Sequence, residues 1–354
     1  CIIIGKNIMI KNFFKEHKIH KRIAQNMDWF FIFNIPYFFI LWIIFCWGMG
    51  ASYYSQNISN FPYFSTEVTF YQFVFFLGLT LFLGGINIYN QLDDLTSLLD
   101  WPLSDSGKYK KQLKYLYVFP NFIDIKSAKT CSIVSISIGV LLISVYSFFV
   151  LGLLILYCCL NLFLYKKYIN IDSFRRLMLK CFFVLLTNFL LFLSGWTYFG
   201  VDYYISIIKY VPLFIMAVLP IILINEVVSY NKYSNKETED RIFIYNNRQK
   251  ISFLSLLLMI LLFFYSYYFI AYDPISAHFS IITIPFLTYA FLRSSNKDYV
   301  RSFRYPIMIL NVLLSWTLFP FLFVAQFIVY YLSKYYYWHR FNIHFPKFVI
   351  DENE

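Results

Sequence analysis

Long apolar stretches recur along this chain, and they restrict its fold more than any other feature. A helix needs roughly 20 consecutive apolar residues to cross the hydrocarbon core of a bilayer. Such stretches occupy residues 29–51, 70–92, 131–165, 178–199, 206–229, 251–270, 275–293 and 306–333. The stretch 131–165 is too long for one helix and carries polar residues in its middle, so we divide it near Tyr146. The sequence therefore predicts an all-α, polytopic membrane protein with nine transmembrane helices.

The composition supports a membrane protein. Hydrophobic residues make up 60% of the chain and charged residues 14%, whereas roughly a quarter of a soluble domain is charged. The bias toward Phe, Tyr, Ile, Lys and Asn also resembles translation of an AT-rich genome, which raises the aromatic count without functional meaning. The net charge of +11 comes from lysines and arginines between apolar stretches, which favours membrane loops over nucleic-acid binding.

The basic residues also predict the orientation. They gather in every second loop, namely in residues 1–28, 93–130, 166–180, 230–250 and 293–305. The loops between these, such as 52–69 and 200–205, contain no Lys or Arg. Since positive loops stay in the cytoplasm, we expect a bacterial inner-membrane protein with a cytoplasmic N-terminus. Only the C-terminal tail disagrees, because Lys334, Arg340 and Lys347 fall on the predicted outer side.

Three segments follow from this pattern: a basic N-terminal segment 1–28, a transmembrane domain 29–333 and an aromatic, basic tail 334–354. The cysteines other than Cys1 lie in or beside apolar runs without metal-ligand spacing. We therefore expect them to be small core residues rather than disulfide partners or zinc ligands.

Two polar elements end apolar stretches on the predicted cytoplasmic side. The first is Asn90-Gln-Leu-Asp-Asp94, and the second is Asn225-Glu226, followed by Asn231, Lys232 and Lys236. Polar groups at the end of a membrane helix cost free energy unless they face a partner or a cavity. The pattern predicts a single site for a charged ligand, although Asp93 and Asp94 would also serve simply to end a helix near water.

The first element has the spacing of a ligand-binding helix face. Asn87, Asn90 and Asp94 are spaced to share one side of a helix. Carboxylate and amide oxygens suit Mg²⁺, which commonly binds through one or two carboxylates together with substrate phosphates. Lys and Arg from neighbouring loops would take the remaining phosphate oxygens. Such a site would stabilise a departing pyrophosphate while an allylic carbon ionises.

Two stretches, FNIPYFFILWIIFCWGMGAS and LGLTLFLGGINIYNQLDD, resemble the UbiA superfamily of intramembrane prenyltransferases, and the likeness extends over about residues 28–346. The resemblance implies a nine-helix, UbiA-like bundle with two aspartate-rich motifs. Members of that family transfer a polyprenyl group from its diphosphate to a lipophilic acceptor, with Mg²⁺ bridging the aspartates and the diphosphate. The tail YYYWHRFNIHFPKF is similar to the ending of some bacterial members.

The family motifs are matched only in part. Asn90 and Asp94 fill two places of N-x-x-x-D-x-x-x-D, while Leu98 occupies the third. In the second motif, Val227 and Asn231 stand where aspartates belong, and Glu226 lies one residue earlier.

The resemblance implies roles for these positions. Asn90 and Asp94 would be the catalytic pair, with Asp94 the Mg²⁺ ligand. Supporting ligands would be Asp93, Asn225, Glu226 and Asn231. The candidates for binding the phosphates, some of them in the segment LYKKYINIDSFRRLMLK, are Lys167, Arg175, Arg176, Lys232 and Lys236.

Two functions remain open at this point. The first is a prenyltransferase whose partners are membrane lipid, a polyprenyl diphosphate donor and a lipophilic acceptor, without nucleic acid. The second is a catalytically decayed UbiA-fold protein that binds lipid or scaffolds a membrane complex, because an Asp→Asn change removes the charge that attracts a divalent cation.

Overall fold

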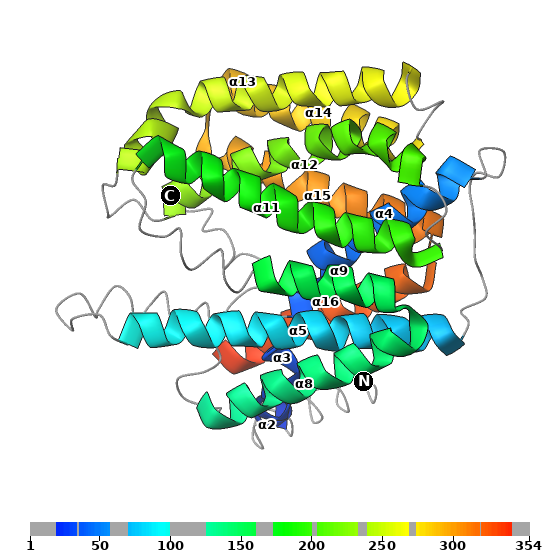
Figure 1. Ribbon diagram of the computed structural model, residues 1–354. Coiled ribbons are helices and arrows are strands. Elements are labelled where there is room, and N and C mark those ends of the chain that lie inside the picture. The colour runs from blue at the N-terminus through cyan, green and yellow to red at the C-terminus, as the bar shows by residue number, and fades with distance from the viewer. Residues whose placement is uncertain are drawn as a thin grey trace, which may run out of the picture. The chain divides into compact units, whose positions relative to one another are not determined.

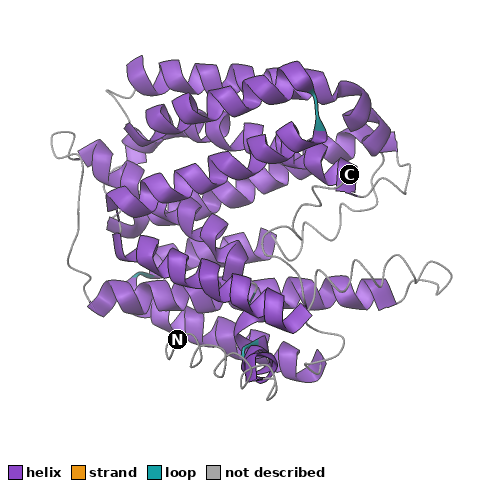
Figure 2. Ribbon diagram, turned by 180° about the vertical axis from the view of Figure 1, so that it is seen from behind, coloured by secondary structure: helices purple, strands orange, loops and turns teal. Residues whose placement is uncertain are grey.

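The computed structural model describes residues 19–33, 35–56, 70–99, 125–160, 173–199, 204–232, 239–268, 274–318 and 320–341. Every regular element within these ranges is a helix (Figure 1; Figure 2). Five of the helices contain a segment long and apolar enough to cross a membrane: Lys126–Tyr146, Met178–Trp196, Ile207–Val228, Asn246–Tyr268 and Ile275–Arg293. The structure agrees with an all-α protein that crosses the membrane several times, but it does not confirm the number nine.

The chain forms two compact units, which are described separately. The first takes in residues Cys1–Phe38, Leu77–Val140 and Ala325–Asp351. Its helices are α2 (Ile19–Asn26), α3 (Asp28–Phe31) and most of α5 (Phe70–Leu99), α8 (Ile125–Tyr146) and α16 (Pro320–Phe341).

The second unit takes in residues Phe39–Phe76, Leu141–Val324 and Glu352–Glu354. Its helices are α4 (Ile35–Gln56), α9 (Phe148–Cys159), α11 (Ser173–Trp196), α12 (Tyr204–Lys232), α13 (Glu239–Tyr268), α14 (Pro274–Arg293) and α15 (Asn296–Leu318). Within it α13 packs against both α12 and α14, and α15 packs against α14 and α12 (Figure 1).

In the first unit, small residues bring α5 and α8 together along an antiparallel seam. Ser132 donates a hydrogen bond of 2.7 Å from its hydroxyl to the carbonyl oxygen of Gly85. A Cβ atom on Gly139 would come within 2.8 Å of the carbonyl oxygen of Gly78. Both helices therefore place a small residue at the contact and another seven residues along, which allows the backbones to approach closely. The contact at Gly85 supports a packing role for the glycines of this stretch.

In the second unit, α4 and α11 make a reciprocal backbone contact. A Cβ atom on Gly48 would collide with the carbonyl oxygen of Phe192, and one on Gly195 would collide with the carbonyl oxygen of Phe45. Beside this crossing, the buried ring of Trp47 packs against Phe192 and against Phe214 of α12. The glycines thus set the closest approach of the two helices, and the aromatic rings fill the space on either side.

The predicted division near Tyr146 is confirmed. Helix α8 ends at Tyr146, Ser147 is extended (φ −157°, ψ 119°), and α9 begins at Phe148. The Ser147 hydroxyl accepts a hydrogen bond from the backbone N–H of Val150, so it caps the new helix.

Two predicted stretches are interrupted where prolines follow. The stretch 306–333 is divided between two helices, because α15 ends at Leu318 and α16 begins at Pro320, with Phe319 outside the described residues. Proline lacks an N–H donor, so it suits the first turn of a helix such as α16. Likewise the stretch 29–51 does not start as one helix, since α3 ends at Phe31 and α4 begins at Ile35, just before Pro36.

The N-terminal helices pack on the end of α16, within the first unit. Tyr336 donates a hydrogen bond of 2.7 Å to Oδ1 of Asp28, and its ring stacks on Phe31 with centroids 4.0 Å apart. On α2, eight residues before Asp28, Nδ1 of His20 is 2.8 Å from the Tyr335 hydroxyl and the His20 ring stacks on His339. These contacts contradict the expectation that the tail starting at residue 334 lies across the membrane from segment 1–28.

The described cysteines are free thiols. Cys46 and Cys181 are buried, as expected of small core residues, whereas Cys159 is exposed on α9. Among the described residues no group of three or more His, Cys, Asp and Glu side chains is placed to hold a metal ion.

Candidate functional site

The first polar element forms the last part of α5. The helix runs without a break to Leu99, so residues 87, 90 and 94 are stacked along one side of it, as their spacing predicts. Ile88 and Leu92, which lie on the opposite side, belong to an apolar cluster with Ile32 and Ala128. The side chains of Asn90, Asp93 and Asp94 lie outside the described residues. Their predicted roles therefore rest on the helix and its register.

The second polar element is built around an ion pair between α11 and α12. Glu226 is buried near the end of the apolar segment of α12, and Lys180 is near the start of that of α11. The Lys180 ammonium lies 2.8 Å from Oε1 and 2.8 Å from Oε2 of Glu226. The side chain of Glu226 is 11% exposed, whereas that of Lys180 is 41% exposed. One cation thus binds both oxygens of a nearly enclosed carboxylate.

This geometry decides what Glu226 can hold. A divalent ion would need free carboxylate oxygens and further oxygen ligands nearby. Here both oxygens already contact Lys180, and no metal-binding group of side chains is found in the part of the chain that the structure describes. The described residues of the second element do not fit Mg²⁺. Asn225 lies next to Glu226 on α12 and is partly buried.

Sequence reasoning missed Lys180 as a site residue and assigned it only to a basic loop. The signal was nevertheless present, because Lys180 and Glu226 each lie just inside the apolar segment of a neighbouring span. Charged side chains within membrane helices usually pair with one another. A search for opposite charges at matching depths in consecutive spans would have found the pair.

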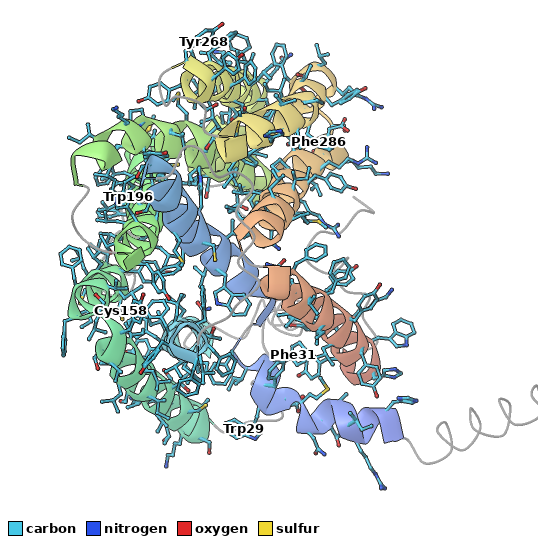
Figure 3. The ribbon with its side chains drawn as sticks, turned by 90° about the vertical axis from the view of Figure 1, so that its right-hand side faces the viewer. Trp29, Phe31, Cys158, Trp196, Tyr268 and Phe286 are labelled. Carbon is cyan, nitrogen blue, oxygen red and sulfur yellow. The ribbon has the colours of Figure 1, made fainter. Side chains whose placement is uncertain are left out.

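The pair fixes which ends of α11 and α12 lie together. At the opposite end of α11 lies the buried Trp196, which is labelled in Figure 3. Its ring packs on Tyr210 of α12 with ring centroids 4.9 Å apart. The two helices are therefore antiparallel neighbours that are joined at both ends. Their polar ends bring the start of α11 to the same side as the end of α12.

Several residues predicted to bind phosphate or to support the metal belong to these two helix ends. Arg175 and Arg176 lie in the first turn of α11, while Asn231 and Lys232 lie in the last turn of α12, with side chains outside the described residues. Lys167 and Lys236 lie outside the described residues altogether. The backbone thus gathers the first four positions around the Lys180–Glu226 pair. Whether α5 joins them in one site stays a prediction, because its end belongs to the other unit.

A second buried carboxylate, Asp298, has a simpler explanation. It accepts a hydrogen bond of 2.6 Å from the Ser295 hydroxyl, and the Ser295 oxygen in turn lies 3.3 Å from the backbone nitrogen of Asp298. Arg301 and Arg293 lie 3.5 and 3.7 Å from the same carboxylate. This is a capping arrangement at the start of α15, with Ser295 before the first turn and an acidic residue three positions later. It holds the turn between α14 and α15 rather than a ligand.

Comparisons with known proteins do not show a family. No protein-family model matches the chain, and no curated protein matches it. A solved structure described as "Structural and mechanistic insights into the biosynthesis of Digeranylgeranylglyceryl phosphate synthase in membranes" is similar over 80% of this chain and 96% of its own, with 12% identical residues and a TM-score of 0.49. A likeness of this size does not identify a function.

Proposed function

We propose that the chain is a membrane prenyltransferase of the UbiA type, which moves a polyprenyl group from its diphosphate to a lipophilic acceptor. The observation that carries the proposal is the Lys180–Glu226 pair, with its buried carboxylate, at the polar ends of two membrane-length helices. Charged groups are costly at this depth unless a function retains them. The sequence of α5 adds a second set of polar residues, spaced for one helix face, on the same predicted side of the membrane.

In this proposal each predicted residue has a role. Asn90 and Asp94 hold the diphosphate through Mg²⁺, with Asp94 as the metal ligand. Asp93, Asn225 and Asn231 support them. The phosphate oxygens are neutralised by Lys167, Arg175, Arg176, Lys232 and Lys236. When bound, Mg²⁺ supplies positive charge to the diphosphate oxygens.

The chemistry is a transfer of an allylic carbon. The bond between that carbon and the diphosphate oxygen breaks, and its electron pair leaves with the diphosphate. The basic side chains stabilise the negative charge that develops on the leaving group. A nucleophilic atom of the acceptor then bonds to the allylic carbon and gives up a proton. Apolar helices exclude water, which would otherwise capture the cation.

Asp94→Ala tests the proposal. We expect a fall of about 100-fold or more in transfer, because a ligand that acts on the leaving group is removed. The measurement is incorporation of radiolabelled farnesyl diphosphate into lipid-extractable products by membranes that contain the protein and a panel of aromatic and lipid acceptors. Asp105→Ala, eleven residues further along the sequence and outside the predicted motif, is the matched carboxylate control and should keep activity. Equal transfer by the Asp94→Ala variant would contradict the assignment of this site.

A second candidate function is supported by the ion pair itself. Because Glu226 is engaged by Lys180, and Leu98 and Val227 replace family aspartates, the fold would also suit a protein that binds polyprenyl lipid or scaffolds a membrane complex without catalysis. This candidate predicts binding of farnesyl diphosphate but no transfer to any acceptor in the same membranes.

A further inference from the structure

The Lys180–Glu226 pair occupies the place where a metal-binding carboxylate is expected from the sequence. We propose that Lys180 supplies the positive charge for the phosphate end of the lipid substrate at this place, and that Glu226 is the residue that positions it. The inference rests on the proposed function, since it names how one half of that site binds a diphosphate.

The two side chains of the pair differ in how far they are exposed. The carboxylate is nearly enclosed, whereas two-fifths of the Lys180 side chain is exposed. A nearly enclosed carboxylate that holds a more exposed cation has the order of charges of a carboxylate–metal–phosphate site. A lysine can occupy that position because an ammonium binds phosphate as a point charge.

The carboxylate also orients the lysine. Both oxygens of Glu226 lie 2.8 Å from the Lys180 ammonium. Without Glu226, Lys180 would lose that orientation. Glu226 is therefore a positioning residue that acts through Lys180.

Capping of a helix end does not explain the Lys180–Glu226 pair. Asp298 caps the start of α15, but Glu226 lies within α12, which continues to Lys232. The main alternative is that the ion pair only holds α11 against α12. Buried ion pairs contribute little net stability compared with a well-packed neutral pair, so the two roles can be separated by experiment.

The informative variant is Lys180→Gln/Glu226→Gln. Two amides of similar size can bond to each other, whereas Lys180→Gln alone would leave a buried carboxylate without its cation and is expected to destabilise the fold. We expect the double variant to melt close to the unchanged protein. In EDTA it should bind farnesyl diphosphate about tenfold more weakly or worse, as one charge-assisted contact to phosphate is lost.

The measurement is binding of farnesyl diphosphate to the purified full chain in detergent, in EDTA and in Mg²⁺. Lys250→Gln, which removes an exposed cation from α13, controls for a general loss of positive charge and should bind as the unchanged protein does. Inorganic pyrophosphate is the first competitor, and it separates recognition of the diphosphate from recognition of the farnesyl group. Vesicles that contain phosphatidic acid are the second competitor, and they test whether the site binds a lipid phosphate instead.

The outcomes separate the two proposals. Binding in EDTA that is weakened by the double variant, kept by Lys250→Gln and competed by pyrophosphate supports Lys180 as the built-in cation. Unchanged EDTA binding in the double variant, or binding that phosphatidic acid but not pyrophosphate displaces, overturns it. Binding by the unchanged protein that needs Mg²⁺ entirely overturns the inference and leaves the proposed function standing. Failure to bind farnesyl diphosphate under any condition removes the proposed function, and the inference with it.

Discussion

The hydrogen bond between Tyr336 and Asp28 holds the N-terminal helices on α16. The substitution Tyr336→Phe tests how much this bond contributes to the docking of those helices. The Asp28 carboxylate is 5% exposed and the Tyr336 hydroxyl lies 2.7 Å from it, while the rings of Tyr336 and Phe31 stack almost in parallel. The substitution removes the donor but keeps the stacked ring. The change therefore isolates the hydrogen bond from the packing.

The expected cost follows from the charge on the acceptor. A hydrogen bond to a charged group contributes roughly 1.5–3 kcal/mol. A loss of that size shifts the equilibrium between docked and released N-terminal helices by roughly 10- to 100-fold, since each 1.4 kcal/mol is a factor of ten. Global unfolding should change less than local release, because α2 and α3 form an edge of their unit.

Limited trypsin digestion in detergent measures the release. Arg22 is exposed on α2, and cleavage there requires the helix to open, so its rate reports the opened population. We expect Tyr336→Phe to be cut at this position roughly tenfold faster or more. Tyr331→Phe makes the same chemical change on the same helix at a side chain that is 61% exposed, and should be cut at the original rate. Equal rates for the two variants would refute the reasoning.

Two further predictions concern packing and topology. Gly195→Ala should lower the free energy of unfolding by about 1–3 kcal/mol, because its Cβ would collide with the Phe45 carbonyl oxygen. Gly152→Ala, with nothing within 4 Å of the new Cβ, should not. Thermal melting in detergent compares the two, and equal melting would show that the α4–α11 contact can relax. The contacts of His20 and Asp28 with α16 predict that both termini lie on the same side of the membrane, so the number of crossings is even. In a bacterial host, a C-terminal fusion to green fluorescent protein should be fluorescent, and a C-terminal fusion to alkaline phosphatase should be inactive. An active phosphatase fusion would contradict the prediction that both termini lie on the same side.

An even number of crossings also accounts for the charges of the tail. Helix α15 starts among Arg293, Lys297 and Arg301, and α16 ends near Lys334 and Arg340. With an even number of crossings both basic ends lie in the cytoplasm, and the alternation of loop charges holds to the end of the chain.

Much of the helical content could be predicted from hydropathy, but helix boundaries within continuous apolar runs could not. The division after Tyr146 was found because polar residues interrupt the run there. At Pro320 the apolar residues continue on both sides, so length alone gave one helix instead of two. The predicted side of the tail depends on that helix count, since one crossing more or fewer moves everything after it to the other side of the membrane.

The candidate site shows a similar limit. The register of Asn90 and Asp94 on α5 follows from spacing within one helix, and the structure supports that helix. The pairing of Lys180 with Glu226 depends instead on how α11 and α12 are rotated about their axes. Helix α12 is apolar on nearly every side, so apart from Glu226 its sequence does not indicate which side faces α11. Opposite charges at matching depths nominate the pair, and the packed structure shows that the two side chains meet.

The glycine contacts have a consequence for the history of the chain. Glycine codons are rich in G and C, so pressure toward AT-rich codons would remove glycine wherever another residue is tolerated. Gly48, Gly85, Gly139 and Gly195 occupy places where even a methyl group meets backbone. Exposed Phe, Tyr and Ile side chains meet no such limit. The spacing of the small residues, rather than the many aromatic ones, is therefore the pattern by which distant relatives of this chain should be recognised.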